Sequence, residues 1–469
     1  MKKSLSAIFL ILLLSAAAAA GEKYTADWES LDSRPIPQWY DDAKFGIFIH
    51  WGVYAVPAHG EWYWSFLKHD KKYLDYHNRV FGENFKYADF APMFKAEMFE
   101  PAEWAELFRR SGARYVVLTS KHHDGYALFP SKYSWNWNSV DTGPHRDLLG
   151  DLTQAVRAAG LKMGYYYSLY EWYNPLYLAR PDEYVETHMI PQIKELVETY
   201  KPSILWTDGE WEKHSDVWRS REILTWLFNE SPVKDEVVVN DRWGNDTKGK
   251  HGGFYTSENA PVEQTASETS AAGRKWEECH TFSGAWGYNR TEKLANYLSA
   301  EQVIHMLIEV VSRGGNLLMN VGPMADGIIP IPQQERLLEV GDWLRVNGEA
   351  IYGTKPWRVA EDGKKAPSGG YSHGGLNVIQ KYDKKAWRRN VRYTSKGDAV
   401  YAISLVWPGK TLELTAPVTS TETKVEMLGV KGMLEWRAEN GKMNIRTPSL
   451  GVDEAPCRYA YVFKLTGVK

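Results

Sequence analysis

Cysteine is scarce in this chain: only two, Cys279 and Cys457, occur among 469 residues. Small secreted domains without a large core depend on several disulfides, and two distant cysteines exclude that kind of scaffold. We do not expect the two to pair, because they lie far apart and in different predicted domains. A hydrophobic core must therefore hold the chain together, and its length is sufficient to build one.

The chain also lacks an excess of positive charge. Its 56 Lys and Arg residues are balanced by 59 Asp and Glu residues, which gives a formal net charge of −3. Proteins that bind nucleic acids or anionic membranes usually carry a basic surface, so neither partner is expected. Glycine patterns of dinucleotide- and phosphate-binding loops are missing as well, and we expect no cofactor.

Long apolar runs are missing after the N-terminus. Residues 1–20 contain two lysines, an apolar run from Leu5 to Leu14 and a closing run of alanines. This order is typical of a cleaved secretory signal peptide, and the apolar run is too short to span a bilayer. We expect a secreted or periplasmic protein, or a lysosomal one if the source is an animal.

Aromatic residues, in contrast, are abundant. The chain has 21 Trp, 28 Tyr and 15 Phe, which together make 14% of its residues. Much of this aromatic content must lie in the core. Aromatic rings also stack on the C–H faces of sugars, so a carbohydrate site is a candidate function.

Strand-like and helix-like segments alternate between about residues 40 and 350. Strands are expected at 44–51, 114–120, 161–168, 203–208, 236–241 and 316–321. Helices are expected at 101–112, 147–160, 182–200, 217–229, 300–312 and 333–347. Repeated strand–helix pairs imply a parallel sheet covered by helices, and their count favours a (β/α)8-like TIM barrel.

After about residue 354 the pattern changes to short alternating segments separated by turns rich in Gly, Pro and Lys. Such segments are typical of a small antiparallel β-sandwich. The sequence therefore predicts a signal peptide over 1–20, a catalytic (β/α)8-like barrel over 21–355 and a C-terminal β-sandwich over 356–469.

Polar residues follow the predicted strands, where a barrel places its active site. Asp208 ends the segment SILWTD and is either a catalytic carboxylate or an ordinary turn or helix-cap residue. His122 and His123 suit hydrogen bonds to hydroxyls better than a metal, because neighbours on a strand point to opposite faces. We expect no metal site. Arg242 either fixes a carboxylate or hydroxyl of a ligand or forms a structural ion pair.

Several glutamates are candidates beside Asp208. Retaining glycoside hydrolysis needs two carboxyl groups about 5–5.5 Å apart, one as nucleophile and one as acid/base. Glu258 and Glu277 are the candidate partners of Asp208. Glu61 and Trp62 lie in the aromatic-rich loop GEWYWSF, which is either a sugar contact or a surface loop packed on the barrel.

An ordered series of segments resembles the family 29 α-L-fucosidases. The matching segments are KFGIFIHWGVYAVPA, GEWYW, YVVLTSKHHDG, GPHRDLLGDL, LKMGYYYS, LWTDGEW, VVNDRWG, KWEEC, WGYN, GGNLLMNVGP and NGEAIYGTKPW. They extend over roughly residues 24–357, nearly the whole predicted barrel. The C-terminal region is similar only in size and in its β-rich texture.

This resemblance implies a retaining exo-glycosidase that removes terminal α-L-fucose from oligosaccharides or glycoconjugates without a metal or cofactor. It implies that Asp208 is the nucleophile. Fucose would be bound by residues that match binding positions of the family: His50, Glu61, Trp62, His122, His123, Tyr166, Arg242 and Trp286. Trp286 corresponds to an aromatic residue on the methyl side of the sugar.

The position of the acid/base varies within that family. The resemblance allows Glu258, in TSEN, or Glu277, in KWEEC, and we favour Glu258. Burial and the charge of Asp208 are expected to raise the pKa of the acid. Two other functions stay open at this point, a fucose-binding protein without activity and a barrel glycosidase for another sugar. Assembly into a homo-oligomer also stays open.

Overall fold

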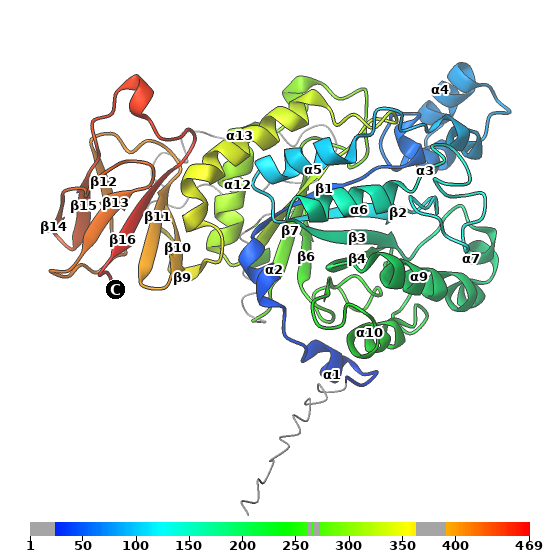
Figure 1. Cartoon of the computed structure of the whole chain (residues 1–469), viewed down its shortest axis with the longest axis horizontal. Helices are drawn as coiled ribbons and strands as arrows, with labels where there is room; N and C mark the ends of the chain where they lie inside the picture. The colour runs from blue at the N-terminus through cyan, green and yellow to red at the C-terminus, as the bar shows by residue number, and fades with distance from the viewer. Residues whose placement is uncertain (1–23, 260–261, 263–264, 267–272, 363–390) are drawn as a thin grey trace, which may run out of the picture.

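The computed structural model describes residues 24–259, 262, 265–266, 273–362 and 391–469. The expected signal peptide, residues 1–20, lies outside the described residues. Within the described ranges, every helix is too short or too polar to cross a bilayer. The described chain forms a larger domain built on a parallel sheet and a smaller domain of antiparallel sheets (Figure 1).

The larger domain is a barrel of eight parallel strands. The strands are β1 (Phe45–Ile49), β2 (Tyr115–Lys121), β3 (Lys162–Ser168), β4 (Ile204–Asp208), β5 (Val238–Val239), β6 (Tyr255–Glu258), β7 (Trp276–Thr281) and β8 (Asn316–Val321). Their order in the sheet is β5-β4-β3-β2-β1-β8-β7-β6. A parallel bridge between Asn240 and Phe254 joins the two end strands, so the sheet curls back on itself. The predicted (β/α)8-like barrel is confirmed.

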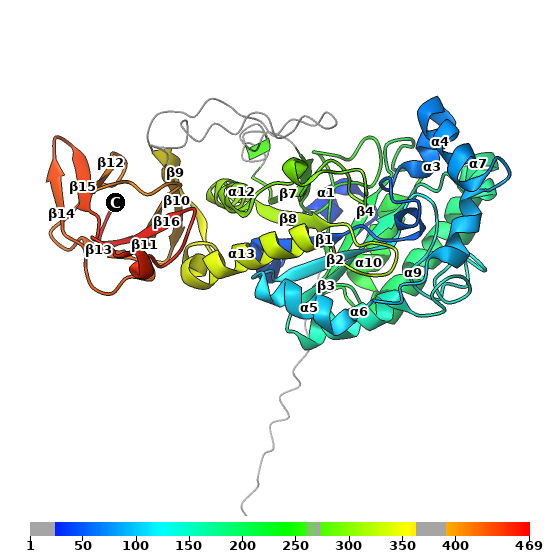
Figure 2. The same ribbon diagram turned by 90° about the horizontal axis from the view of Figure 1, so that it is seen from above.

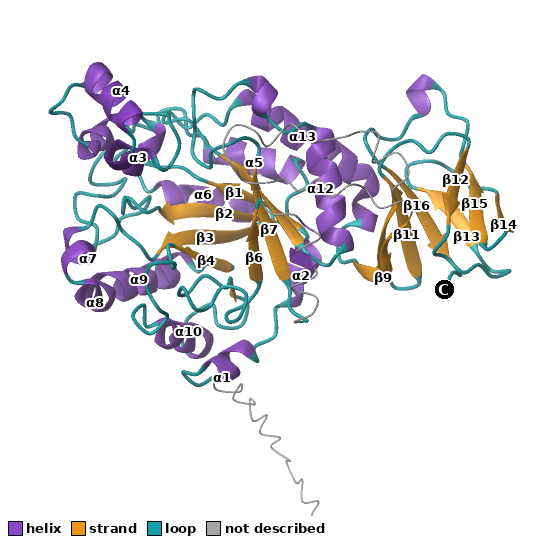
Figure 3. Cartoon of the chain, turned by 180° about the vertical axis from the view of Figure 1, so that it is seen from behind, coloured by secondary structure: helices purple, strands orange, loops and turns teal. Residues whose placement is uncertain are grey.

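Helices surround these strands (Figure 3). The helices are α1 (Trp28–Asp32), α2 (Gln38–Ala43), α3 (Tyr63–His69), α4 (Lys71–Phe81), α5 (Pro101–Arg110), α6 (Leu148–Ala158), α7 (Pro175–Ala179), α8 (Pro181–Tyr184), α9 (Ile190–Tyr200), α10 (Ser220–Asn229), α12 (Ala300–Ser312) and α13 (Ile331–Asn347). Local sequence fixes several of their ends. Asp147 caps α6 by accepting the Gly150 N–H at 2.8 Å, and Ser299 and Gln302 form a capping box at the start of α12.

The strands are buried on both faces. Their outward side chains pack against the helices, and their inward side chains form a second cluster that fills the barrel. This inner cluster is rich in aromatic rings, including Tyr40, Phe48, Tyr115, Tyr166 and Trp206. Part of the unusual aromatic content of the sequence therefore lies directly beneath the carboxyl ends of the strands.

The structure contains elements that the sequence does not predict. No strand is expected between residues 242 and 299, yet β6 and β7 complete the barrel there. Both strands carry polar residues that are buried in the fold, among them Ser257, Glu277 and Glu278. A polar strand resembles a loop in the sequence, because the partners that satisfy its side chains lie far away in the chain.

The smaller domain is an antiparallel β-sandwich, as predicted. One sheet has the order β13-β16-β11-β10-β9 and the other β12-β15-β14. Their strands are β9 (Lys355–Asp362), β10 (Val391–Lys396), β11 (Ala399–Ser404), β12 (Thr411–Leu414), β13 (Lys424–Met427), β14 (Trp436–Glu439), β15 (Lys442–Arg446) and β16 (Tyr461–Thr466). An apolar cluster that includes Val425, Met443 and Phe463 joins the two sheets.

The two domains meet at α12 and α13 (Figure 2). Arg392 of β10 is buried there, 2.5 Å from the Glu309 carboxylate of α12 and 3.3 Å from that of Glu361. The Trp343 indole N–H donates to the Ala460 carbonyl at 2.9 Å. The helices α3 and α4 lie at the opposite end of the molecule from the sandwich.

Candidate active site

A narrow cavity opens at the carboxyl ends of the barrel strands. Its lining consists of Phe48, His50, Glu61, Trp62, His122, His123, Tyr166, Trp206, Asp208, Trp211, Arg242, Glu258, Cys279 and Trp286. Every site residue named from the sequence is in this set except Glu277. The cavity has a volume of about 80 Å³, far below the roughly 300–1,000 Å³ of pockets for drug-sized ligands. A single sugar ring suits it better than a long chain.

Asp208 is the last residue of β4, and both of its carboxylate oxygens are held. Arg242 Nη1 donates to Oδ1 at 2.8 Å, and the Tyr166 hydroxyl donates to Oδ2 at 2.9 Å. The alternative of a helix cap is excluded, because the next helix begins only at Ser220. Burial raises the pKa of Asp208, but the charge of Arg242 and the hydrogen bonds from Arg242 and Tyr166 outweigh it, and the pKa lies below its usual value. The carboxylate is thus ionised and fixed in place.

Arg242 lies between two carboxylates. Its Nη1 contacts Asp208, its Nη2 donates to Glu258 Oε2 at 2.9 Å, and its Nε donates to Thr256 Oγ1 at 3.0 Å. The guanidinium carbon lies 4.7 Å from the ring centre of Trp206. Three donor groups and a stacked face fix the guanidinium as a planar fork, which is a geometry that Lys could not reproduce.

Glu258 ends β6, and its side chain is 29% exposed. Burial raises the pKa of Glu258, but the charge of Arg242, its hydrogen bond to the carboxylate and the charge of Lys248 together outweigh burial, so the pKa lies below its ordinary value. The prediction that the acid has a raised pKa is therefore wrong for Glu258. It considered burial and the charge of Asp208 but not the cation between the two carboxylates, which acts more strongly than their mutual repulsion.

Three histidines contribute neutral rings. Burial lowers the pKa of His50 and of His123 to about 4, and it lowers that of His122 well below the usual value. His50 Nδ1 lies 2.7 Å from the Asn320 amide oxygen, and His123 Nδ1 lies 2.6 Å from the Ser168 hydroxyl. Each neutral ring offers one donor and one acceptor, which is the combination that sugar hydroxyls require.

His122 and His123 both reach the cavity, although neighbours on a strand would face opposite ways. The strand β2 ends at Lys121, so both histidines lie in the turn beyond it, with ring centres 4.1 Å apart. The strand argument used against a metal therefore does not apply to this pair. Among the residues that the structure describes, no group of three or more His, Cys, Asp or Glu side chains is arranged to hold a metal ion.

Glu61 connects its own loop to the loop of Trp286 and Gly287 by hydrogen bonds. Its Oε2 accepts the backbone N–H of Gly287 at 2.7 Å and that of Trp286 at 3.1 Å. Burial raises the pKa of Glu61 to about 7. These bonds hold the backbone of Trp286, whose ring centre lies 5.0 Å from that of His50, and Trp62, the neighbour of Glu61 in the chain, lines the same cavity.

Glu277 does not line the cavity. It is 1% exposed and lies inside the barrel, where its Oε2 accepts the hydroxyls of Tyr40 at 2.7 Å and of Tyr115 at 2.5 Å. Its Oε1 accepts the Trp206 indole N–H at 3.0 Å. Burial raises the pKa of Glu277 to about 7. All of its contacts are with the protein core, so a ligand in the cavity would meet Trp206 rather than this carboxyl group.

Four cavity residues were not named from the sequence as site residues: Phe48, Trp206, Trp211 and Cys279. The alternation of side chains along a strand could have identified two of them. Phe48 precedes His50 by two positions and Trp206 precedes Asp208 by two, so each pair lies on the same face of its strand. Trp211 lies in a loop, where no such periodicity helps. Cys279 also lines the cavity, and neither cysteine of the chain is in a disulfide.

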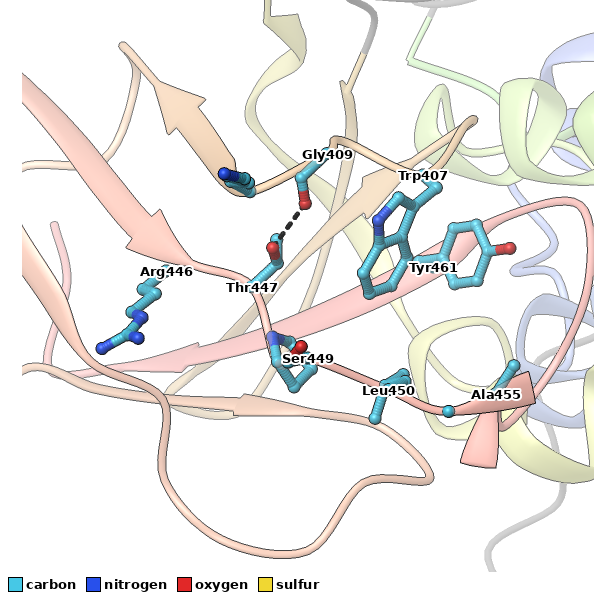
Figure 4. A pocket seen from close by; sticks show the side chains of 11 residues that line it. Trp407, Gly409, Arg446, Thr447, Ser449, Leu450, Ala455 and Tyr461 are labelled. Carbon is cyan, nitrogen blue, oxygen red and sulfur yellow. Dashed lines mark hydrogen bonds between the residues drawn. The ribbon is translucent and has the colours of Figure 1, made fainter. Parts of the chain in front are cut away.

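A larger cavity of about 710 Å³ lies in the C-terminal sandwich (Figure 4). Trp407 and Tyr461 form one side of it, and Arg446 and Ser449 lie across from them. No Asp, Glu or His is among its lining residues, all of which lie in the described part of the chain. It lacks the carboxyl groups that glycoside hydrolysis requires, so the barrel cavity is the candidate active site despite its smaller volume.

Comparison with known proteins shows the family of the chain. The sequence model of the α-L-fucosidase family matches residues 11–349, and that of the α-L-fucosidase C-terminal domain matches residues 384–466. Human tissue α-L-fucosidase is 44% identical over 98% of this chain and 97% of the relative. An α-L-fucosidase of Branchiostoma floridae is 46% identical over 98% and 99%. A Thermotoga maritima α-fucosidase solved in complex with fucose aligns with a TM-score of 0.78 and 35% identity, covering 95% of this chain and 100% of that one.

Proposed function

The chain belongs to the α-L-fucosidase family, and from this premise we propose a retaining double displacement in which Asp208 is the nucleophile and Glu258 is the acid/base. As a family member the protein is a glycoside hydrolase that acts on fucosylated glycans. Membership supports neither of the open alternatives, a binding protein without activity or a glycosidase for another sugar.

The observation that carries this proposal is the single guanidinium shared by two carboxylates. Arg242 contacts Asp208 at 2.8 Å and Glu258 at 2.9 Å, which makes the two carboxylates neighbours across one planar group. Retention requires two neighbouring carboxyl groups at the site, and a pair that shares one guanidinium is in keeping with it.

In the first step the Asp208 carboxylate attacks the anomeric carbon of fucose and the bond to the leaving oxygen breaks. Glu258 donates its proton to that oxygen, and a fucosyl ester of Asp208 forms. In the second step Glu258 takes a proton from water, the water oxygen attacks the anomeric carbon, and the ester bond breaks. Fucose leaves with its original anomeric configuration, and both carboxyl groups return to their starting states.

Arg242 serves both steps as a shared counter-ion. Before the first step it faces the Asp208 carboxylate, and Glu258 must take up a proton although Arg242 lowers its pKa. Once the ester forms, Asp208 is neutral and Glu258 is the anion, so the same guanidinium now stabilises the base. The positive charge stays in place while the negative charge moves from one partner to the other, which keeps reorganisation small.

Binding is assigned to the neutral histidines and the aromatic walls. His50, His122 and His123 offer donors and acceptors to the fucose hydroxyls, while Trp62 and Trp286 provide apolar surface, with Trp286 on the methyl side. A narrow cavity at the strand ends is in keeping with action on a terminal fucose rather than on a residue within a chain.

Glu258 is proposed over Glu277 because only Glu258 reaches the cavity. Replacing Asp208 with Gly tests the nucleophile: we expect nearly complete loss of aryl fucosidase activity and partial recovery with azide, which can occupy the vacated space. Full activity in Asp208→Gly refutes the proposal. In Glu258→Ala we expect the loss to be largest for substrates with poor leaving groups and the alkaline limb of the pH profile to disappear.

We also propose that the protein is exported, through the predicted signal peptide over residues 1–20. The relatives include proteins named for tissue and for plasma, which is in keeping with a secreted or lysosomal location. N-terminal sequencing of the protein from its native source should begin near Gly21, and an intact Met1 on the purified protein would refute cleavage.

A further inference from the structure

We propose that Glu277 is a positioning residue, whose carboxylate holds the Trp206 indole in the orientation that forms the floor of the cavity beneath Tyr166 and Arg242. The inference rests on the roles proposed above for Asp208 and Glu258. It gives a buried carboxyl group, otherwise a candidate for the acid/base, a different task.

The surroundings of Glu277 are built to satisfy an anion. Two tyrosine hydroxyls donate to Oε2 and one indole N–H donates to Oε1, at 2.7, 2.5 and 3.0 Å. A carboxyl group that is 1% exposed is costly to bury without such partners, and an apolar side chain would fill a barrel interior more cheaply. Of the three donors, only Trp206 also lines the cavity. Through these hydrogen bonds Glu277 can therefore influence the site only by way of Trp206.

Trp206 contacts the groups that hold the proposed nucleophile. Its ring stacks on Tyr166 with centres 5.8 Å apart and planes inclined by 19°, and the Arg242 guanidinium lies 4.7 Å from its centre. Tyr166 and Arg242 are the two donors to the Asp208 carboxylate. A change in the tilt of the indole would therefore move both donors together.

The N–H···O bond is what fixes that tilt. The Phe48 ring packs against Trp206, with ring centres 5.0 Å apart and planes inclined by 57°. This apolar contact does not select one rotation of the indole. The indole N–H is the only polar group of Trp206, and Glu277 is its acceptor. A hydrogen bond is directional, so it selects one rotation of the ring where apolar packing would tolerate several.

The geometry also separates this role from proton donation. An acid/base must reach the leaving oxygen, or reach it through one water molecule. Glu277 lies on the core side of Trp206, and both of its oxygens already accept bonds from core donors. Loss of its carboxylate should disturb both chemical steps equally, whereas loss of an acid/base affects poor leaving groups most.

Three variants test the proposal. Glu277→Gln keeps an oxygen that can accept the indole N–H and should retain activity within about tenfold of the parent. Glu277→Leu keeps the bulk but removes the acceptor, and Trp206→Phe keeps an aromatic ring but removes the donor. Each should lower kcat about 100-fold, the scale of a displacement near 1 Å at the reacting groups, by the same factor for aryl fucosides with good and poor leaving groups.

The double variant Trp206→Phe/Glu277→Leu should lose no more activity than Glu277→Leu alone, because both changes break the same bond. Losses that multiply would overturn the proposal, as would azide rescue of Glu277→Leu or the disappearance of its alkaline limb. If Glu277→Leu does not fold, as judged by circular dichroism, Glu277→Ser takes its place in the cycle. Failure of the proposed catalytic roles would appear separately, as full activity in Asp208→Gly.

Discussion

Replacing Arg242 with Met should both weaken catalysis and shift its pH dependence upward. The guanidinium is 4% exposed and contacts Asp208 at 2.8 Å and Glu258 at 2.9 Å. A pair of unit charges about 4 Å apart at an effective dielectric near 20 interacts by about 4 kcal/mol. If most of one such interaction is lost from the transition state, kcat/KM should fall by about 100- to 1,000-fold.

The direction of the pH shift follows from the two pKa values that Arg242 lowers. Without the cation, burial becomes the dominant influence on Asp208 and Glu258, the charge of Asp208 adds to it at Glu258, and both pKa values rise. Asp208 must be ionised, so the acidic limb moves to higher pH. Glu258 must be protonated, so the alkaline limb moves to higher pH as well. We expect the bell-shaped profile of kcat/KM against pH to shift to higher pH in Arg242→Met. Its maximum should also be lower.

The assay is the pH dependence of kcat/KM with an aryl α-L-fucoside, measured beside a matched control. Arg345 on α13 is 74% exposed and far from the cavity, so Arg345→Met should leave the profile unchanged. A profile of Arg242→Met that stays in place or moves to lower pH would refute the shared counter-ion, whatever the size of the loss in rate.

Two further changes test other parts of the structure. Glu61→Ala removes the acceptor of two backbone N–H groups, so the loop that carries Trp286 should loosen and KM should rise about tenfold or more; an unchanged KM would show that Glu61 does not support the loop. Arg392→Met breaks the buried contact with Glu309 between the domains and should lower the free energy of unfolding by about 3–5 kcal/mol in a denaturant titration. The exposed Arg437→Met should change it by less than about 1 kcal/mol, and equal losses in the two variants would contradict the account.

The barrel and part of its rim could be predicted from the sequence. Strands buried on both faces appear as continuous apolar runs, and the capped helices between them have the expected spacing. Because parallel strands end at one rim, the placement of Asp208 and Arg242 directly after such runs was enough to bring them together. Side chains two positions apart on a strand share a face, so the position of Trp206 two residues before Asp208 would have predicted it as a site residue.

The rest depends on contacts between distant residues. The strand β7 looks like a loop because Glu277 and Glu278 are charged, and only the fold shows that Tyr40, 237 positions away, helps to bury Glu277. The depressed pKa of Glu258 likewise depends on a guanidinium that reaches it from another strand end. Sequence spacing carries no information about such pairs, so a carboxylate can be named as a candidate but its protonation state cannot be assigned.

The most direct test of the central claim is to identify the residue that becomes covalently linked to the sugar. A 2-deoxy-2-fluoro-α-L-fucosyl fluoride slows hydrolysis of the ester more than its formation, so the intermediate should accumulate and survive digestion to peptides. We predict that mass spectrometry locates the fluorofucosyl group on Asp208, at the end of β4. A label on Glu61, Glu210, Glu258 or Glu277 would contradict the account, and so would turnover of the probe with inversion and without any labelled peptide.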